Sequence, residues 1–189
     1  MIKKIKLSFL AIITAFFFST PVVADEHPSY SVSGNIGMMS DYVFRGIPQS
    51  SSSAYGGVDF ETGGFYLGTW FADLDPNGEW ASGSHQGIEY DVYAGYGMDI
   101  TDSLSGYIGY TIYRYSDKGS DAFDDDYDEY NIGISYAVSD DFSVSLDYAN
   151  GENTLTNQTE VDYDVGTLTL DYLGLTLTIG EWGLNEDDP

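Results

Sequence analysis

Six charged residues in the sequence have the types and positions to control the passage of ions. Five of them are acids at the polar positions of alternating segments, namely Asp59, Glu89, Asp91, Asp99 and Asp147. The sixth is Arg45, which lies in the short aromatic stretch MSDYVFRGIPQS from Met39 to Ser50. A guanidinium keeps its charge at any relevant pH and can bind a carboxylate through two parallel hydrogen bonds. We interpret these residues as candidates for the lining and constriction of a pore.

Arg45 lies in the connection 41–53, next to Val43 and Phe44. A loop that projects into water seldom needs such apolar neighbours, so we expect this segment to fold back towards the mouth of a barrel whose wall is rich in carboxylates. Arg45 would then hold the loop to an inward-facing acid and set the constriction. The candidate partners are Asp59, Glu89 and Asp91. The alternative is an exposed Arg45 that balances Asp41 locally.

The composition excludes several classes of partner. The chain has 31 acidic and 6 basic residues, and three of the bases (Lys3, Lys4 and Lys6) lie within the first six positions. Nucleic acid is therefore not an expected partner, because binding to phosphates needs clustered Lys and Arg. Cysteine is absent, which excludes disulfides and thiolate metal sites. The 17 Tyr, 10 Phe and 3 Trp favour a folded β protein over a disordered acidic chain.

The N-terminus has the pattern of an export signal. The basic start MIKKIK is followed by an apolar run from Leu7 to Phe18 and then by Val22-Val23-Ala24, a small-residue cleavage pattern. A membrane anchor is the alternative, but the apolar run is shorter than the ~20 residues that a spanning helix needs. We therefore predict a signal peptide over residues 1–24 and one mature domain over 25–189, as in bacterial envelope proteins.

The rest of the chain alternates with a period of two, which is typical of β-strands with two different faces. In the segment 86–100, even positions are mainly apolar, whereas odd positions carry glycine and acids. The expected strands are 30–40, 54–61, 64–73, 86–100, 104–115, 130–136, 142–148, 161–170 and 175–182. The eighth changes phase near Gly166 and Thr167, which predicts a β-bulge.

Two features favour a membrane barrel over a secreted soluble sandwich or half-barrel. The acids share their face with glycine and other small residues, which suits a narrow, wet lumen. The connections also alternate in length, as in outer-membrane barrels with short periplasmic turns and longer extracellular loops. The long ones are expected at 41–53, 74–85, 116–127 and 149–160. The sequence thus predicts an antiparallel transmembrane β-barrel in the outer membrane of a Gram-negative bacterium.

The number of expected strands conflicts with that architecture. Nine strands are found, whereas single-chain bacterial barrels use an even number. The sequence also ends on a loop-like tail, Asn185 to Pro189, rather than on a final aromatic residue. We expect the chain to be incomplete at its C-terminus; a miscount by one strand is the alternative.

Other motifs favour simple interpretations. Asp73, Asp75 and Asn77 follow the order of a calcium-binding loop, but the position of the bidentate acid is Ser84. An acidic turn is the favoured interpretation and a calcium site is the alternative. The acidic run 121–129 is expected to be solvated, or to bind lipopolysaccharide phosphate through divalent cations. No nucleophile, acid pair or phosphate loop is evident, so we expect neither enzymatic activity nor a cofactor.

Four stretches carry a resemblance to a known family. They are SGNIGMMSDYVFRGIPQS, GGVDFETGGFYLGTWFADLD, EYDVYAGYGMDI and GLTLTIGEW. With them, nearly the whole mature chain resembles the TorF-type porins of proteobacteria, a family formerly of unknown function. The resemblance implies an outer-membrane barrel and passive transport, without naming a substrate. It also implies further strands after the point where this sequence ends.

The expected function follows from the acids on the polar face. Electric fields are concentrated in narrow pores with low-dielectric walls, so a lumen lined with carboxylates should favour cations and small neutral solutes. We predict a porin-like protein for passive diffusion, with outer-membrane lipid and lipopolysaccharide as its surroundings. The alternative is a non-conducting structural or adhesive barrel whose lumen is filled with side chains.

Overall fold

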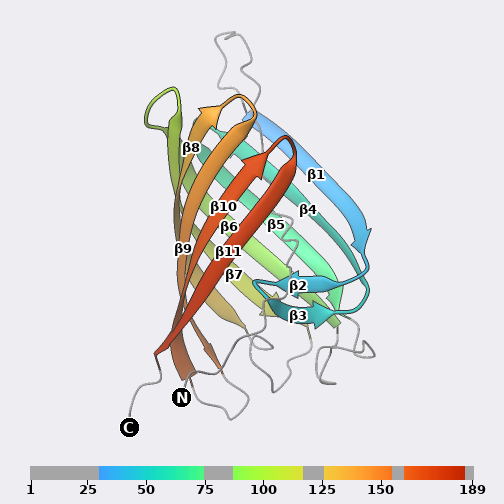
Figure 1. Cartoon of the computed structure of the whole chain (residues 1–189). Helices are drawn as coiled ribbons and strands as arrows, with labels where there is room; N and C mark the ends of the chain where they lie inside the picture. The colour runs from blue at the N-terminus through green and yellow to red at the C-terminus, as the bar shows by residue number, and fades with distance from the viewer. Residues whose placement is uncertain (1–29, 75–86, 117–125, 155–159, 186–189) are drawn as a thin grey trace.

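The computed structural model describes residues 30–74, 87–116, 126–154 and 160–185. These residues form eleven strands: β1 (Tyr30–Met39), β2 (Tyr42–Phe44), β3 (Ile47–Ser50), β4 (Ser53–Thr62), β5 (Phe65–Leu74), β6 (Gly87–Asp99), β7 (Leu104–Tyr115), β8 (Tyr127–Ser139), β9 (Phe142–Thr154), β10 (Glu160–Tyr172) and β11 (Leu175–Asn185). Nine of them make one strongly curved sheet, in the order β1-β4-β5-β6-β7-β8-β9-β10-β11 (Figure 1). The strands β2 and β3 pair only with each other. Among the described residues, no helix has the length and apolar character to cross a membrane.

Every pairing in the large sheet is antiparallel. Apart from β2 and β3, the order of the strands in the sheet is their order in the chain. Tight turns gather at one end, which is the upper end in Figure 1. Two of them are two-residue turns, at Gly63-Gly64 and Leu173-Gly174, and all four residues have positive φ. This geometry matches the twist of a β-hairpin. The predicted all-β antiparallel fold is confirmed.

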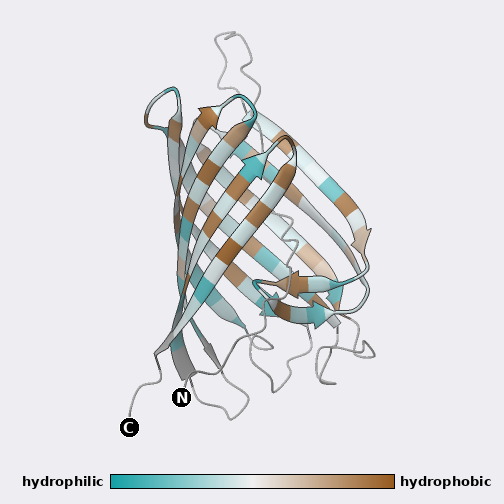
Figure 2. Ribbon diagram, in the orientation of Figure 1, coloured by the Kyte–Doolittle hydropathy of each residue, from teal (hydrophilic) through white to brown (hydrophobic). Residues whose placement is uncertain are grey.

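The two faces of the sheet differ sharply. In β6, Ile88, Tyr90 and Val92 are 40–47% exposed, whereas Glu89 and Asp91 are 1% and 7% exposed. The same alternation recurs along the neighbouring strands (Figure 2). Large apolar side chains therefore cover the convex face, while acids, tyrosines and small residues line the concave face. A soluble sandwich would bury its apolar face instead.

Glycines on the concave face make room for tyrosine rings. In five directly paired positions a glycine on one strand faces a tyrosine on its partner: Gly37 with Tyr55, Gly68 with Tyr93, Gly95 with Tyr66, Gly133 with Tyr107 and Gly151 with Tyr163. A Cβ atom at any of these glycines would lie less than 3.0 Å from the tyrosine side chain. The rings therefore lie flat against the wall. The abundance of glycine thus has a packing role that the sequence analysis did not foresee.

The sheet is open between its first and last strands. β1 and β11 are its two edges and do not pair with each other. Both strands run away from the end with the tight turns, so they point in the same direction (Figure 1). An antiparallel closure would need an odd number of further strands between these edges.

The structure corrects several predicted elements. β8 and β9 extend well beyond 130–136 and 142–148, so the expected connection 149–160 is mostly strand. The predicted bulge at Gly166 is wrong, because β10 keeps a continuous register with both neighbours. The apolar residues of β10 change from odd to even positions for another reason. Tyr163 and Val165 point inward and are buried, whereas farther along β10 the apolar residues face outward.

Candidate functional site

A small β-hairpin closes much of one end of the concave face. It consists of β2 and β3, joined by Arg45 and Gly46 with φ values of 47° and 88°. Figure 1 shows it at the end opposite the tight turns. The hairpin carries the Arg45 stretch and folds back onto the sheet, as predicted. Its two strands, however, were expected to be loop.

Arg45 connects the hairpin to strands β8 and β11 of the concave face. Its guanidinium forms an ion pair with Glu129 on β8, and the two side chains are 18% and 0% exposed. The indole Nε1 of Trp182 on β11 donates a hydrogen bond to the carbonyl oxygen of Arg45, at 3.0 Å. The guanidinium carbon also lies 4.7 Å from the centre of the Phe44 ring, a cation–π distance. The tip of the hairpin is thus anchored to two strands far from its own in the sequence.

The charge on Arg45 is secure. Burial is the largest single effect and would lower the pKa of the guanidinium, but the Glu129 carboxylate together with Tyr113 and Tyr127 raises the pKa overall. Such a paired cation can be buried, whereas an unpaired one would be costly. Arg45 thus holds the segment to an inward acid, as predicted, and its role in setting a constriction stays a prediction. The three candidate partners were wrong, because Glu129 takes that place.

Tyr42 anchors the base of the hairpin. Its hydroxyl donates to Glu89 Oε1 at 3.2 Å, and the Tyr115 hydroxyl donates to the same oxygen at 3.3 Å. The Tyr42 ring meets Trp70 edge-on, with centroids 5.4 Å apart. Burial, followed by the charge of Glu89, raises the pKa of the Tyr42 hydroxyl well above its ordinary value. Tyr42 therefore acts as a neutral hydrogen-bond donor.

Buried aromatic rings complete this packed end. Tyr113 and Tyr127 stack at a centroid distance of 4.3 Å, and Phe44 of the hairpin approaches Tyr113 at 5.8 Å. Tyr163 is fully buried and lies 5.6 Å from Trp182 between ring centroids. Together with Arg45, Glu89 and Glu129, these rings fill the space under the hairpin. In the sequence these tyrosines counted only as signs of a folded β protein, and this cluster was not predicted.

The predicted acids fall into two groups. Glu89 and Asp91 are buried on β6 near the hairpin, and one oxygen of each makes no hydrogen bond to the described residues. Asp59 is buried on β4 and accepts a hydrogen bond from the Tyr93 hydroxyl. The other two, Asp99 and Asp147, lie towards the tight turns. The structure therefore does not bring all five acids to one constriction.

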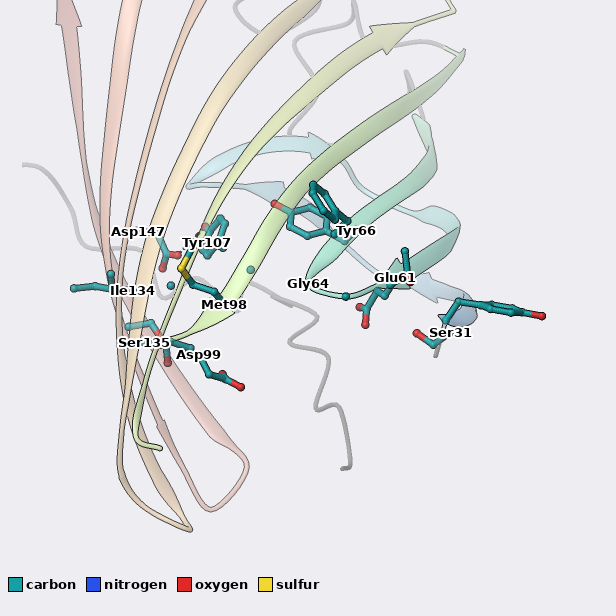
Figure 3. A pocket seen from close by; sticks show the side chains of 18 residues that line it. Ser31, Glu61, Gly64, Tyr66, Met98, Asp99, Tyr107, Ile134, Ser135 and Asp147 are labelled. Atoms are coloured by element: carbon teal, nitrogen blue, oxygen red, sulfur yellow. Dashed lines mark hydrogen bonds between the residues drawn. The ribbon is translucent and has the colours of Figure 1, made fainter. Parts of the chain in front are cut away.

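Asp147 and Asp99 border a hollow of about 670 Å³ at the end with the tight turns. Its lining comes from seven strands, β1 and β4 to β9, and is rich in glycine and serine. The Tyr107 hydroxyl donates to Asp147 at 2.8 Å, and Figure 3 shows the two side chains together. The third acid of the lining is Glu61, and none of the described lining residues is Lys or Arg. The hollow is therefore negatively charged and open.

The possible calcium loop gains no support from the described part of the chain. Asp73 is exposed near the end of β5, and Asp75 and Asn77 lie outside the described residues. Within the ranges that the structure covers, no three His, Asp or Glu side chains are arranged to hold a metal ion.

The concave wall described above lies almost entirely within one family match. A family model for bacterial proteins of unknown function, named Gcw_chp, matches residues 23–181. The chain belongs to the Gcw_chp family. The matched range includes both the hairpin and the acids of the hollow. No curated protein and no solved structure matches the chain. Because the Gcw_chp description gives no activity, the function is argued from the geometry.

Proposed function

We propose that this protein is a porin-like outer-membrane β-barrel for passive diffusion of small solutes, with a preference for cations. The β2–β3 hairpin forms its constriction, and the negatively charged hollow is the vestibule on the side of the tight turns. The resemblance to TorF-type porins points in the same direction. Export by the signal peptide predicted at residues 1–24 belongs to this proposal.

The observation that carries the proposal is the inverted polarity of the sheet. Apolar side chains such as Leu67, Ile108, Ile132, Leu146 and Ile179 are 52–60% exposed on the convex face. Water would make such a surface unstable against association, whereas lipid would cover it. In β4 to β9 the convex positions carry acids only near the strand ends, at Asp73, Asp128 and Glu152. This distribution is in keeping with the cost of a charge that faces lipid near the midplane.

The charges support cation preference. At the packed end, the Glu129 carboxylate balances the guanidinium of Arg45, so this ion pair adds no net charge. At the other end, the hollow holds three acids and no base among its described lining residues. A cation crossing the lumen would meet a negative potential along its path, and an anion would be repelled.

Closure of the sheet is part of the proposal. The lipid-facing pattern continues to β1, where Val32, Ile36 and Met38 are 64–87% exposed. An unpaired strand edge in lipid would leave backbone groups without hydrogen bonds, so both edges must find partner strands. The described strands then form most of the wall.

The packed end favours a second candidate, a structural barrel without conductance. Here the buried ring cluster and the hairpin would permanently fill the lumen, as side chains do in small barrels. Planar-bilayer recordings of the full-length protein in a salt gradient separate the two. A reversal potential of cation-selective sign supports the pore, and anion selectivity contradicts our assignment of the faces. Absence of any conductance supports the structural barrel.

The membrane location has an independent test. We expect the folded protein in the outer-membrane fraction, with an electrophoretic mobility that changes on heating, as for other barrels. Recovery of the folded protein as a soluble periplasmic species would end the proposal.

A further inference from the structure

The β2–β3 hairpin is attached to the wall by side chains rather than by strand pairing. Its two strands hydrogen-bond only with each other and stay outside the nine-stranded sheet. It joins β1 through Ser40 and Asp41, and β4 through Ser51 and Ser52. Ser40, Asp41 and Ser52 are exposed. The hairpin can therefore move as a unit without breaking any backbone pairing of the large sheet.

The contacts at the tip are few and specific. Arg45 pairs with Glu129, and the Arg45 carbonyl oxygen accepts the hydrogen bond from Trp182. We call these two contacts the tip latch. They reach β8 and β11, on the far side of the concave face from β1 and β4. Breaking the tip latch separates the hairpin from that far side but leaves its two connections intact.

The backbone at the tip is held in a costly conformation. Arg45 has a φ of 47°, in the left-handed region that a residue with a Cβ seldom adopts. The equivalent turn between β4 and β5 uses glycine at both positions, Gly63 and Gly64. Non-glycine residues in this region persist where the surroundings over-determine them, often at switches and clamps. Here the side chain that the turn disfavours is the one that makes the ion pair.

We infer that the β2–β3 hairpin is a hinged gate, with Ser40-Asp41 and Ser51-Ser52 as its hinges and the tip latch as its fastening. In the closed state the hairpin lies over the ring cluster and Glu89. When the tip latch opens, the hairpin swings towards β1 and β4, and the hollow becomes continuous with the opposite end of the concave face. That the open gate admits solutes rests on the proposed pore function. The motion of the hairpin does not depend on that function.

The motion can be measured by thiol labelling. Gln49 on β3 is 1% exposed, and the chain has no cysteine, so Q49C introduces one buried reporter. A matched control is S145C, which is 2% exposed on β9 and lies in the hollow, where its hydroxyl contacts Ser135. A membrane-impermeant maleimide is added to folded protein in liposomes, with and without E129Q. Heat-modifiable mobility verifies that each variant is folded.

We expect E129Q to speed the labelling of Q49C about tenfold, in keeping with the loss of one charged hydrogen-bonded pair. The labelling of S145C should not change. W182F, which removes the indole donor and keeps an aromatic ring of smaller size, should give a smaller increase at Q49C. Equal rates for Q49C in the presence and absence of both substitutions would overturn the gate. An equal acceleration at S145C would also overturn it, because the wall would then have loosened as a whole.

A reversible cross-link between the hairpin and β8 tests whether the gate controls conductance. R45C and E129C together can be joined by a short bis-methanethiosulfonate, which forms disulfides that a reductant removes. We expect the joined protein to lose conductance and to regain it on reduction. Conductance that is insensitive to the lock would overturn the gate. If neither the locked nor the reduced protein conducts but labelling responds to E129Q, the hinged hairpin stands and the pore function fails.

Discussion

The concave face has two halves built on the same nine strands but filled differently. Near the tight turns it is a hollow bordered by serine, glycine and three acids. At the opposite end Tyr113, Tyr127 and Tyr163 are buried beneath the β2–β3 hairpin. In both halves tyrosines lie on glycines of the wall. The difference therefore arises mainly from the hairpin, a segment outside the sheet. Under the proposed pore function, the wall would set the width of the lumen and the hairpin would control access to it.

Removing the hairpin should erase the difference between the two halves and gives the largest expected effect. Met39 and Ser53 are direct partners in the β1–β4 pairing, so residues 40–52 can be replaced by an Asn-Gly turn without changing the register. We expect single-channel conductance to rise several-fold, with heat-modifiable mobility retained.

The matched control for this deletion lies at the other end of the sheet. Leu173 and Gly174 can be replaced by Asn-Gly in a turn of the same type, and conductance should stay as in the wild type. If removing residues 40–52 left the conductance unchanged, the hairpin would not be the constriction.

The wall that both halves share can be tested at its glycines. A Cβ at Gly95 would collide with Tyr66 and with the carbonyl oxygen of Ile108, whereas nothing lies within 4 Å of one at Gly166. We expect G95A to lower the free energy of unfolding by about 1–3 kcal/mol, the usual cost of overpacking. G166A should change it by less than about 0.5 kcal/mol. Urea unfolding in micelles measures both, and equal effects would contradict the packing role of the glycines.

The packed half also allows turn strain to be separated from the ion pair. R45A and R45G both lose the contact with Glu129, but only glycine suits a φ of 47°. R45G should therefore be more stable than R45A by roughly 1 kcal/mol, close to the cost of a left-handed residue. L173G offers the comparison without an ion pair and should exceed the wild type in stability. Equal unfolding midpoints for R45A and R45G would contradict the strained turn.

The smallest expected effect concerns the charge of the hollow. D147N removes one of three acids there and should move the reversal potential slightly towards zero, because the local potential becomes less negative. D73N changes an exposed acid of β5 that does not border the hollow and should leave the reversal potential unchanged. An unchanged value for D147N would mean that selectivity is set elsewhere, with the hairpin as the first place to examine.

The period-two pattern was sufficient to predict the antiparallel sheet and the identity of its two faces. The apolar neighbours of Arg45, Val43 and Phe44, predicted that its segment folds back. Neither signal predicted β2 and β3, because the Arg45-Gly46 turn lacks the Asn-Gly or Asp-Gly signature of a tight hairpin. Glu129 was missed as the partner of Arg45 because it ends an acidic run with the composition of a solvated loop. The curvature of the sheet brings β8 opposite β1, and no local pattern encodes that distance.

The five glycine–tyrosine pairs also affect how the sheet assembles. A strand that slipped by one residue would turn its tyrosine to the convex face, and a slip by two would set the ring against a residue with a Cβ in most cases. Most of these pairs thus accept only one alignment of their two strands. They occur in the β1–β4, β5–β6, β7–β8 and β9–β10 pairings, where they disfavour misaligned neighbours as the sheet assembles.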